Sequence, residues 1–323
     1  MKRLFLFLAT LLVGFLLFGG LISGLGWQEI WKPLSAFPFF GALIVFFLTG
    51  VSLLIGAFRW YFILQKQHCR VSFSATWKTY LAGFSLLFFV PVFPFASEIF
   101  RASYLKEHHA IDLPRGIASV TIDRILEVTS NLFVVVAGGI IFFLLGEHIS
   151  YSLRTLGVIG FIGIWFLLLF FLYIRIFQKK SIIRLFWKGN ESTQETEQEV
   201  FRFFQSRSPF LWQGICFSLG KSFVGIVRAW IVILFFGKGF VILPAITIQG
   251  FYYLAALVPI PGALGFHEAL QAVAFGAFGF GAGTGAAFAL LVRTAEVLFA
   301  VAGLVLLFHF SLRFLKHTMF RFP

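Results

Sequence analysis

The sequence predicts an all-α polytopic membrane protein. Its 323 residues are 59% hydrophobic and only 12% charged, and its apolar runs repeatedly approach the ~20 residues that a helix needs to cross a hydrocarbon core. The formal net charge of +13 comes largely from short loops beside these runs, where Lys and Arg set membrane orientation. We therefore expect an integral membrane protein that meets anionic lipid, and we expect no nucleic-acid partner.

The apolar runs define the expected helices. The first run follows Lys2 and Arg3 and resembles a signal peptide. It is longer than a signal h-region and no small-residue cleavage site follows, so we expect a retained helix. Polar residues 178–208 are expected to form a cytoplasmic loop with an amphipathic piece. The expected apolar helices cover residues 4–23, 38–64, 80–93, 117–145, 156–177, 210–236, 241–257, 266–278 and 285–310.

Two of these segments contain proline breaks. Residues 258–269 read VPIPGALGFHEA, and residues 90–100 read VPVFPFASEIF. Proline removes a backbone donor and clashes with the preceding turn, so each helix should break and restart. Broken backbone at membrane depth is tolerated where it is buried in protein or lines a wet cavity. The residues expected to break the helices are Pro91, Pro94, Pro259, Pro261, Gly262 and Gly265.

The loop charges predict the membrane orientation. Basic residues flank segment 80–93 on both sides, so this segment should enter and leave on the cytoplasmic face, and segment 241–278 should do the same from outside. This gives about six full spans plus two re-entrant hairpins, with both termini cytoplasmic in a bacterial inner membrane. Eight plain crossings are the alternative. The basic positions expected on the cytoplasmic side are Lys2, Arg3, Lys66, Arg70, Lys78, Arg101, Lys106, Arg115, the 179–207 cluster, Arg313, Lys316 and Arg321, against Lys32, Arg154 and Lys238 outside.

An internal repeat accompanies this arrangement. Three features recur in the same order: a Gly-x-x-Arg segment, a proline break followed by Glu, and an Arg-x-x-Glu segment. The first Arg-to-Arg separation, Arg59 to Arg124, equals the second, Arg228 to Arg293. Since each unit makes an odd number of crossings, the second copy should be inverted. We assign residues 1–150 and 151–323 to the two repeats of one membrane domain, an arrangement typical of secondary transporters.

Charged residues within these segments are the candidate site. Arg124 and Glu127 are three residues apart, as are Arg293 and Glu296, so each pair can meet on one helix face. Arginine forks bind phosphate well, and acids beside the breaks can act as counter-ions. The candidate ligand-binding residues are Arg59, Glu98, Arg101, Arg124, Glu127, Arg228, His267, Glu268, Arg293 and Glu296.

Structural roles remain open for the same residues. The Arg and Glu pairs can be ion pairs that hold the fold, because pairing lowers the cost of ~2.5–3.5 kcal/mol for a charge at the bilayer centre. Glu98 and Glu268 can simply complement the helix dipole near a helix start. Arg59 and Arg228 can snorkel to the interface.

The sequence offers no sign of an enzyme or cofactor site. Cys69 and Cys216 give neither a disulfide framework nor metal spacing. His267 beside Glu268 lacks the second histidine of a zinc motif, and residues 276–285 lack the ending of a phosphate loop. We expect no catalytic residue, no metal and no cofactor.

The two broken segments resemble a known family. PIPGALGFHEA followed by LLVRTAEV, and VPVFPFASEIFRASYL followed by SVTIDRILEV, are similar to the lysylphosphatidylglycerol synthase transmembrane family, a flippase-like membrane domain. The family pattern favours Pro-Gly-Gly and Arg-Glu where this chain has Ala263 and His267, and Gly where it has Ser97. The resemblance implies a lipid-translocating domain, here expected to stand without the aminoacyl-transfer domain.

Together these features predict a flippase-like transporter of an anionic lipid or lipid-linked intermediate, which is not expected to be an enzyme. Two other function classes stay open. One is an intramembrane enzyme that modifies a phospholipid or polyprenyl lipid. The other is an accessory subunit that partners a lipid or glycosyl transferase.

Overall fold

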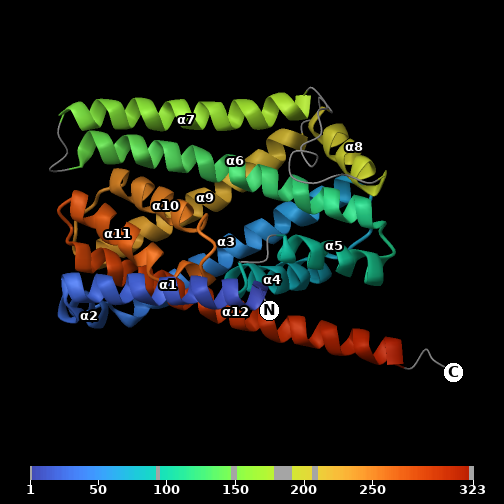
Figure 1. The fold of residues 1–323 in the computed structure, drawn as a ribbon, viewed down its shortest axis with the longest axis horizontal. Helices are drawn as coiled ribbons and strands as arrows, with labels where there is room; N and C mark the ends of the chain where they lie inside the picture. Colours follow the sequence, from blue (N-terminus) through green and yellow to red (C-terminus); the bar gives the residue numbers. More distant parts are fainter. Residues whose placement is uncertain (1, 92–94, 147–150, 178–190, 206–209, 320–323) are drawn as a thin grey trace.

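Helices make up the fold. The computed structural model describes residues 2–91, 95–146, 151–177, 191–205 and 210–319, and no strand occurs among them (Figure 1). This confirms the predicted all-α polytopic class. In chain order the helices are α1 (Lys2–Leu25), α2 (Trp27–Ser35), α3 (Phe39–Lys66), α4 (Phe73–Phe89), α5 (Ala96–His109), α6 (Leu113–Leu145), α7 (Tyr151–Phe177), α8 (Glu191–Gln205), α9 (Phe210–Phe235), α10 (Leu243–Ala255), the 3-10 helix η2 (Pro261–Ala263), α11 (Phe266–Ala277) and α12 (Ala282–Met319).

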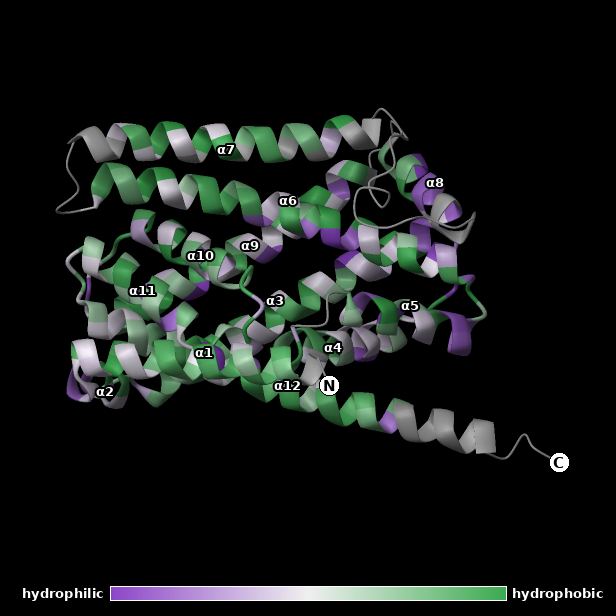
Figure 2. Cartoon of the chain, in the orientation of Figure 1, coloured by the Kyte–Doolittle hydropathy of each residue, from purple (hydrophilic) through white to green (hydrophobic). Residues whose placement is uncertain are grey.

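Five of the described helices are long and apolar enough to cross a membrane. They lie within α1, α3, α6, α9 and α12, and each keeps a low content of charged residues. The sixth predicted crossing corresponds to α7, which contains the shorter apolar stretch Thr155–Leu168. The ribbons of α1 and α7 are coloured largely as hydrophobic in Figure 2. Such surfaces suit contact with lipid tails.

Two helices, α2 and α5, were not among the expected apolar helices, because both are short and polar. α2 lies between two of the expected apolar helices; it buries Ile30 and exposes Trp27 and Trp31. This pattern is typical of an interfacial helix with an aromatic anchor. α5 was not predicted either, because its 14 residues include six Glu, Arg, Lys or His side chains and no apolar run.

The first broken segment also begins earlier than predicted. α4 starts at Phe73, where the Ser72 side chain caps it by accepting a hydrogen bond from the Ala75 N–H at 3.3 Å. Basic and polar residues in the first turns of α4 lower the local hydropathy, so the apolar pattern does not show where the helix starts. Pro94 lies outside the described residues.

The two broken segments form hairpins at opposite ends of the molecule. Figure 1 shows α4 and α5 in its right half and α10 and α11 in its left half. α4 packs on α12, and α10 packs on α6, while α3 and α9 pack on each other. Each hairpin therefore leans on the long helix of the other half. Polar residues gather at the end formed by α5 and α8 (Figure 2).

Equivalent glycines allow equivalent close contacts. Gly56 on α3 faces Tyr80 on α4, and Gly225 on α9 faces Gln249 on α10; a Cβ at either glycine would collide with the facing side chain. Both glycines precede the repeat arginines by three residues. The two helix pairs thus approach each other through the same repeat position. The inverted placement of the repeats in a membrane stays a prediction.

Candidate functional site

The first break places Glu98 at the start of α5. α4 ends at Phe89, and Phe95 precedes α5 in the left-handed conformation with φ of 69°. A non-glycine residue pays about 1–2 kcal/mol for that conformation. Glu98 is the third residue of α5, where a carboxylate is favoured by the helix dipole.

Buried arginines surround Asp123 beside this break. Arg59 Nε lies 2.6 Å from one Asp123 oxygen, and Arg101 Nη2 lies 2.9 Å from the other. All three side chains are nearly inaccessible. The Arg101 guanidinium also stacks over the Trp60 ring, 3.8 Å from its centroid. Arg101 therefore lies on the buried side of the cluster, and it is not among the residues that line the pocket of about 230 Å³ at the first break.

Arg124 connects the cluster to Glu98. Its Nη2 lies 2.6 Å from Glu98 Oε1, and its Nη1 lies 3.1 Å from Glu127 Oε2. The predicted Arg124 and Glu127 pair on one helix face is therefore present. Glu127 also accepts a hydrogen bond from Lys221 on α9 and lies 3.5 Å from Arg59 Nη2. The network thus spans α3, α5, α6 and α9.

The second break repeats this geometry. α10 ends at Ala255, and positive φ angles at Gly262 (55°), Ala263 (53°) and Gly265 (75°) turn the chain into α11. Glu268 is the third residue of α11 and accepts a hydrogen bond from the Gly265 N–H at 2.7 Å. Its other oxygen lies 2.7 Å from Arg293 Nη1. Glu268 therefore both caps the helix and pairs with the repeat arginine.

Glu296 corresponds to Glu127 but has different partners. Tyr252 Oη donates a hydrogen bond to it at 2.7 Å, and Arg228 Nη1 lies 3.6 Å away. The predicted pair of Arg293 and Glu296 does not form in the described structure. Arg293 points instead to α11, where the buried Glu268 carboxylate offers a closer partner.

Arg59 and Arg228 make a reciprocal contact across the two halves. Arg59 Nη1 donates to Ser218 on α9 at 3.0 Å, and Arg228 Nη1 donates to Thr49 on α3 at 3.0 Å. In the repeat alignment, Thr49 and Ser218 are equivalent positions. Such exchange of partners is the pattern of a two-fold interface. Both arginines are buried, so neither snorkels to the interface.

The ends of the two breaks lie together. A Cβ at Gly262 would meet Arg293 Nη2 at 2.6 Å and the Phe88 ring of α4 at 3.0 Å. η2 and α4 are in contact for this reason. The residues of the second break thus lie directly against the end of the first hairpin helix.

His267 is buried in the second cluster. Its Nε2 lies 3.5 Å from Gln271 Nε2, and its ring meets the Tyr252 ring edge to face at 5.2 Å. Within the described residues, no group of three potential ligands could hold a metal. Cys69 is buried and Cys216 exposed, and both are free thiols.

Sequence reasoning missed two members of the first cluster. Neither Asp123 nor Lys221 is among the candidate residues chosen from the sequence, although both make ion pairs in this cluster. Lys221 precedes Arg228 by seven residues, which places both on one face of α9. That spacing was the signal that Lys221 points inward.

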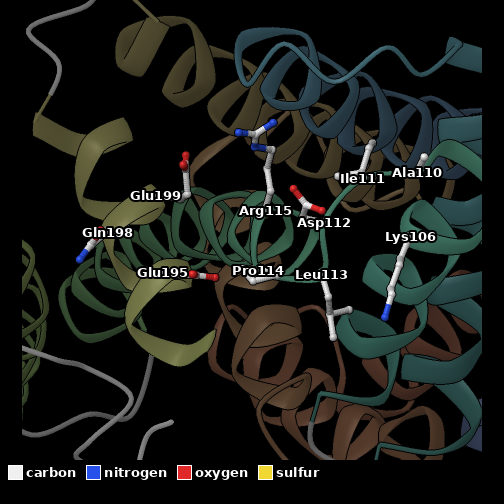
Figure 3. A pocket seen from close by; sticks show the side chains of 10 residues that line it. All are labelled: Lys106, Ala110, Ile111, Asp112, Leu113, Pro114, Arg115, Glu195, Gln198 and Glu199. Carbon is white, nitrogen blue, oxygen red and sulfur yellow. The ribbon is translucent and has the colours of Figure 1, made fainter. Parts of the chain in front are cut away.

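Two pockets that border α5 differ in chemistry. A pocket of about 230 Å³ at the first break is lined by Arg124, Glu98 and mostly apolar residues. A larger pocket of about 720 Å³ lies between α5, the start of α6 and α8 (Figure 3). None of the predicted site residues lines it. Its charged residues of both signs, such as Lys106, Arg115 and Glu195, are exposed.

Comparison with known proteins identifies the family. The model of the lysylphosphatidylglycerol synthase TM region matches residues 5–303. No curated protein and no solved structure gives a significant match. The matched range includes both breaks and every charged residue of the two clusters. The protein therefore belongs to the family of the lysylphosphatidylglycerol synthase transmembrane region.

Proposed function

We propose that this protein translocates an anionic lipid or lipid-linked intermediate across the membrane. Its family supports a lipid-related membrane function. The observation that carries the proposal is the repetition of one Arg and Glu pair at each break: Arg124 with Glu98, and Arg293 with Glu268. Each pair joins the helix after a break to a long helix, so movement of a hairpin would exchange its partners.

The arginines supply the binding chemistry. A guanidinium presents a planar fork that matches a phosphate and keeps its charge at any physiological pH. In the resting protein, the glutamates occupy these forks as internal counter-ions. A lipid phosphate would displace a glutamate, and return of the glutamate would release the lipid. This exchange avoids leaving a bare charge in the membrane interior.

The proposal includes an orientation. The α4 and α5 hairpin opens to the cytoplasm and the α10 and α11 hairpin to the outside of a bacterial inner membrane. The contact between Gly262 and Phe88 then lies near the middle of the membrane. Alternating access would occur by rocking of the hairpins against α6 and α12, as in other inverted-repeat transporters.

Reconstitution into liposomes tests the function. Fluorescent phosphatidylglycerol in the inner leaflet should become accessible to an external quencher faster than in empty liposomes, while the lipid remains chemically unchanged. No acceleration for any anionic lipid would contradict transport. Conversion of the lipid to a new product would favour the intramembrane enzyme. Stable co-purification with a transferase, combined with no transport, would favour the accessory subunit.

A further inference from the structure

The two charge clusters are not electrically equivalent. The ion pairs of the second cluster balance two arginines, Arg228 and Arg293, with two glutamates, Glu268 and Glu296. In the first cluster the ion pairs join more cations than carboxylates. The cations are Arg59, Arg101, Arg124 and Lys221, and the carboxylates are Glu98, Asp123 and Glu127. The first cluster therefore carries one excess positive charge.

The two Arg and Glu pairs also differ in exposure. The side chains of Arg124 and Glu98 are 32% and 17% exposed, whereas those of Arg293 and Glu268 are 11% and 0% exposed. Arg124 and Glu98 line the pocket of about 230 Å³ at the first break. The excess charge is thus accessible to a ligand at Arg124.

α1 accounts for the closure of the second break. It packs on η2 and α11, and its Gly14 lies so close that a Cβ there would meet Leu264 O at 3.0 Å. Phe95, at the equivalent point of the first break, is 68% exposed. Within the described part of the chain, α1 is therefore a cover that the first break lacks.

The rim of the first pocket is apolar. Leu86, Leu87, Val90 and Pro91 form the wall beside Arg124. Leu87 on α4 and Ile99 on α5 continue outward as exposed hydrophobic side chains. A ligand that fits both Arg124 and this apolar rim has an anionic head and a hydrocarbon tail.

We propose that the first break is the ligand-binding site in this state, and that it selects a lipid with one phosphodiester charge. The phosphate binds Arg124, the tail lies along Leu87, Phe95 and Ile99, and one negative charge neutralises the cluster. A phosphomonoester would bring a second charge without a partner. This inference rests on the proposed function and names the substrate class of the same site.

Photo-crosslinking of the unaltered protein tests the placement. In neutral nanodiscs, diazirine-labelled phosphatidylglycerol should label residues within 86–91 or 95–99, and labelling confined to residues 256–268 would overturn the inference. Excess unlabelled phosphatidylglycerol should abolish the label. Soluble glycerophosphoglycerol, the deacylated phosphodiester headgroup, should not compete at equal concentration, and competition by it would overturn the requirement for a lipid. Phosphatidic acid, a monoester, should compete more weakly, and equal competition would overturn the charge selection.

Variants test the charge asymmetry. Arg124→Gln should weaken phosphatidylglycerol binding about tenfold or more, because a charge-assisted hydrogen bond is lost. Arg293→Gln should weaken binding less than Arg124→Gln does, and the control Arg202→Gln, at an exposed pair with Glu199, should leave binding within about twofold. Lys221 does not line the pocket, and Lys221→Met removes the cluster's excess positive charge. This variant should also weaken phosphatidylglycerol binding, while phosphatidylcholine binding stays unchanged. Equal loss in Arg124→Gln and Arg293→Gln would contradict the inference.

The same preparations separate the two proposals. Lipid transport in liposomes combined with labelling at residues 256–268 would overturn the site and leave the translocase intact. Labelling within residues 86–91 or 95–99 without transport would overturn the translocase and support the site.

Discussion

Arg124 Nη2 lies 2.6 Å from Glu98 Oε1, and this ion pair joins the long helix α6 to the first turn of α5 just after the first proline break. Arg293 and Glu268 repeat it at the second break. Each arginine is therefore bound by an acid whose position depends on the break. A ligand that displaces the glutamate from the arginine therefore also breaks a contact that holds the hairpin against the long helix.

Glu98→Gln should separate binding from transport. The amide holds Arg124 less strongly than the carboxylate does, so phosphatidylglycerol should bind about tenfold more tightly and leave more slowly. Transport should fall although affinity rises. Nanodisc binding and liposome transport measured on one preparation check this. Glu199→Gln, which alters a surface pair with Arg202, should change neither, and faster transport by Glu98→Gln would refute the counter-ion role.

Asp123→Asn should destabilise the fold. Arg59 and Arg101 are buried and share Asp123 as a counter-ion, and removing one partner of a buried ion pair costs about 3–5 kcal/mol. Thermal unfolding in detergent should show a clear drop in Tm. Arg202→Ala breaks an exposed pair and should cost at most about 1 kcal/mol. Similar Tm values for the two variants would show that the buried pairs contribute little.

Cysteine labelling should place the two ends of the molecule on opposite sides of the membrane. In a Cys69→Ser, Cys216→Ser background, Ala110→Cys and Ala36→Cys lie in exposed connections at the two ends. A membrane-impermeant maleimide should label Ala36→Cys from outside whole cells and Ala110→Cys only after the membrane is opened. Labelling of both from one side would rule out the predicted orientation.

Gly14→Leu should lift α1 from the second break. A side chain at this position has no room against Ile260 and Leu264, so a reporter in Leu264→Cys should react faster with a maleimide in the Gly14→Leu background. Gly20→Leu is a matched control, because a Cβ at Gly20 meets no atom within 4 Å. Equal reaction rates in the two backgrounds would mean that α1 is not the cover.

The sequence predicted the fold class because long apolar runs and proline breaks are local signals. It did not predict α5, since a polar helix that packs against α6 has no hydropathy signature. The candidate residues chosen from the sequence include members of both charge clusters, among them Arg59, Glu98, Arg228 and Glu268. Hydropathy and motif spacing can identify such residues before their partners are known.

The partners themselves depend on tertiary contacts. Spacing on one helix predicted Arg124 with Glu127 correctly and Arg293 with Glu296 wrongly. The difference arises because Glu268 approaches Arg293 from another helix, and because Tyr252 and Arg228 occupy Glu296. Asp123 and Lys221 belong to the cluster because of contacts between helices. Asp123 on α6 pairs with Arg59 of α3 and Arg101 of α5, and Lys221 on α9 pairs with Glu127 of α6.

The most direct test of the translocase compares the two repeat arginines in one transport assay. Liposomes containing Arg124→Gln, Arg293→Gln or the surface control Arg202→Gln are assayed for phosphatidylglycerol movement at equal protein content and verified folding. We predict that each of the first two variants loses most of the transport rate, since a lipid must pass both breaks, and that Arg202→Gln keeps it. Unchanged transport in Arg124→Gln and Arg293→Gln would contradict the account.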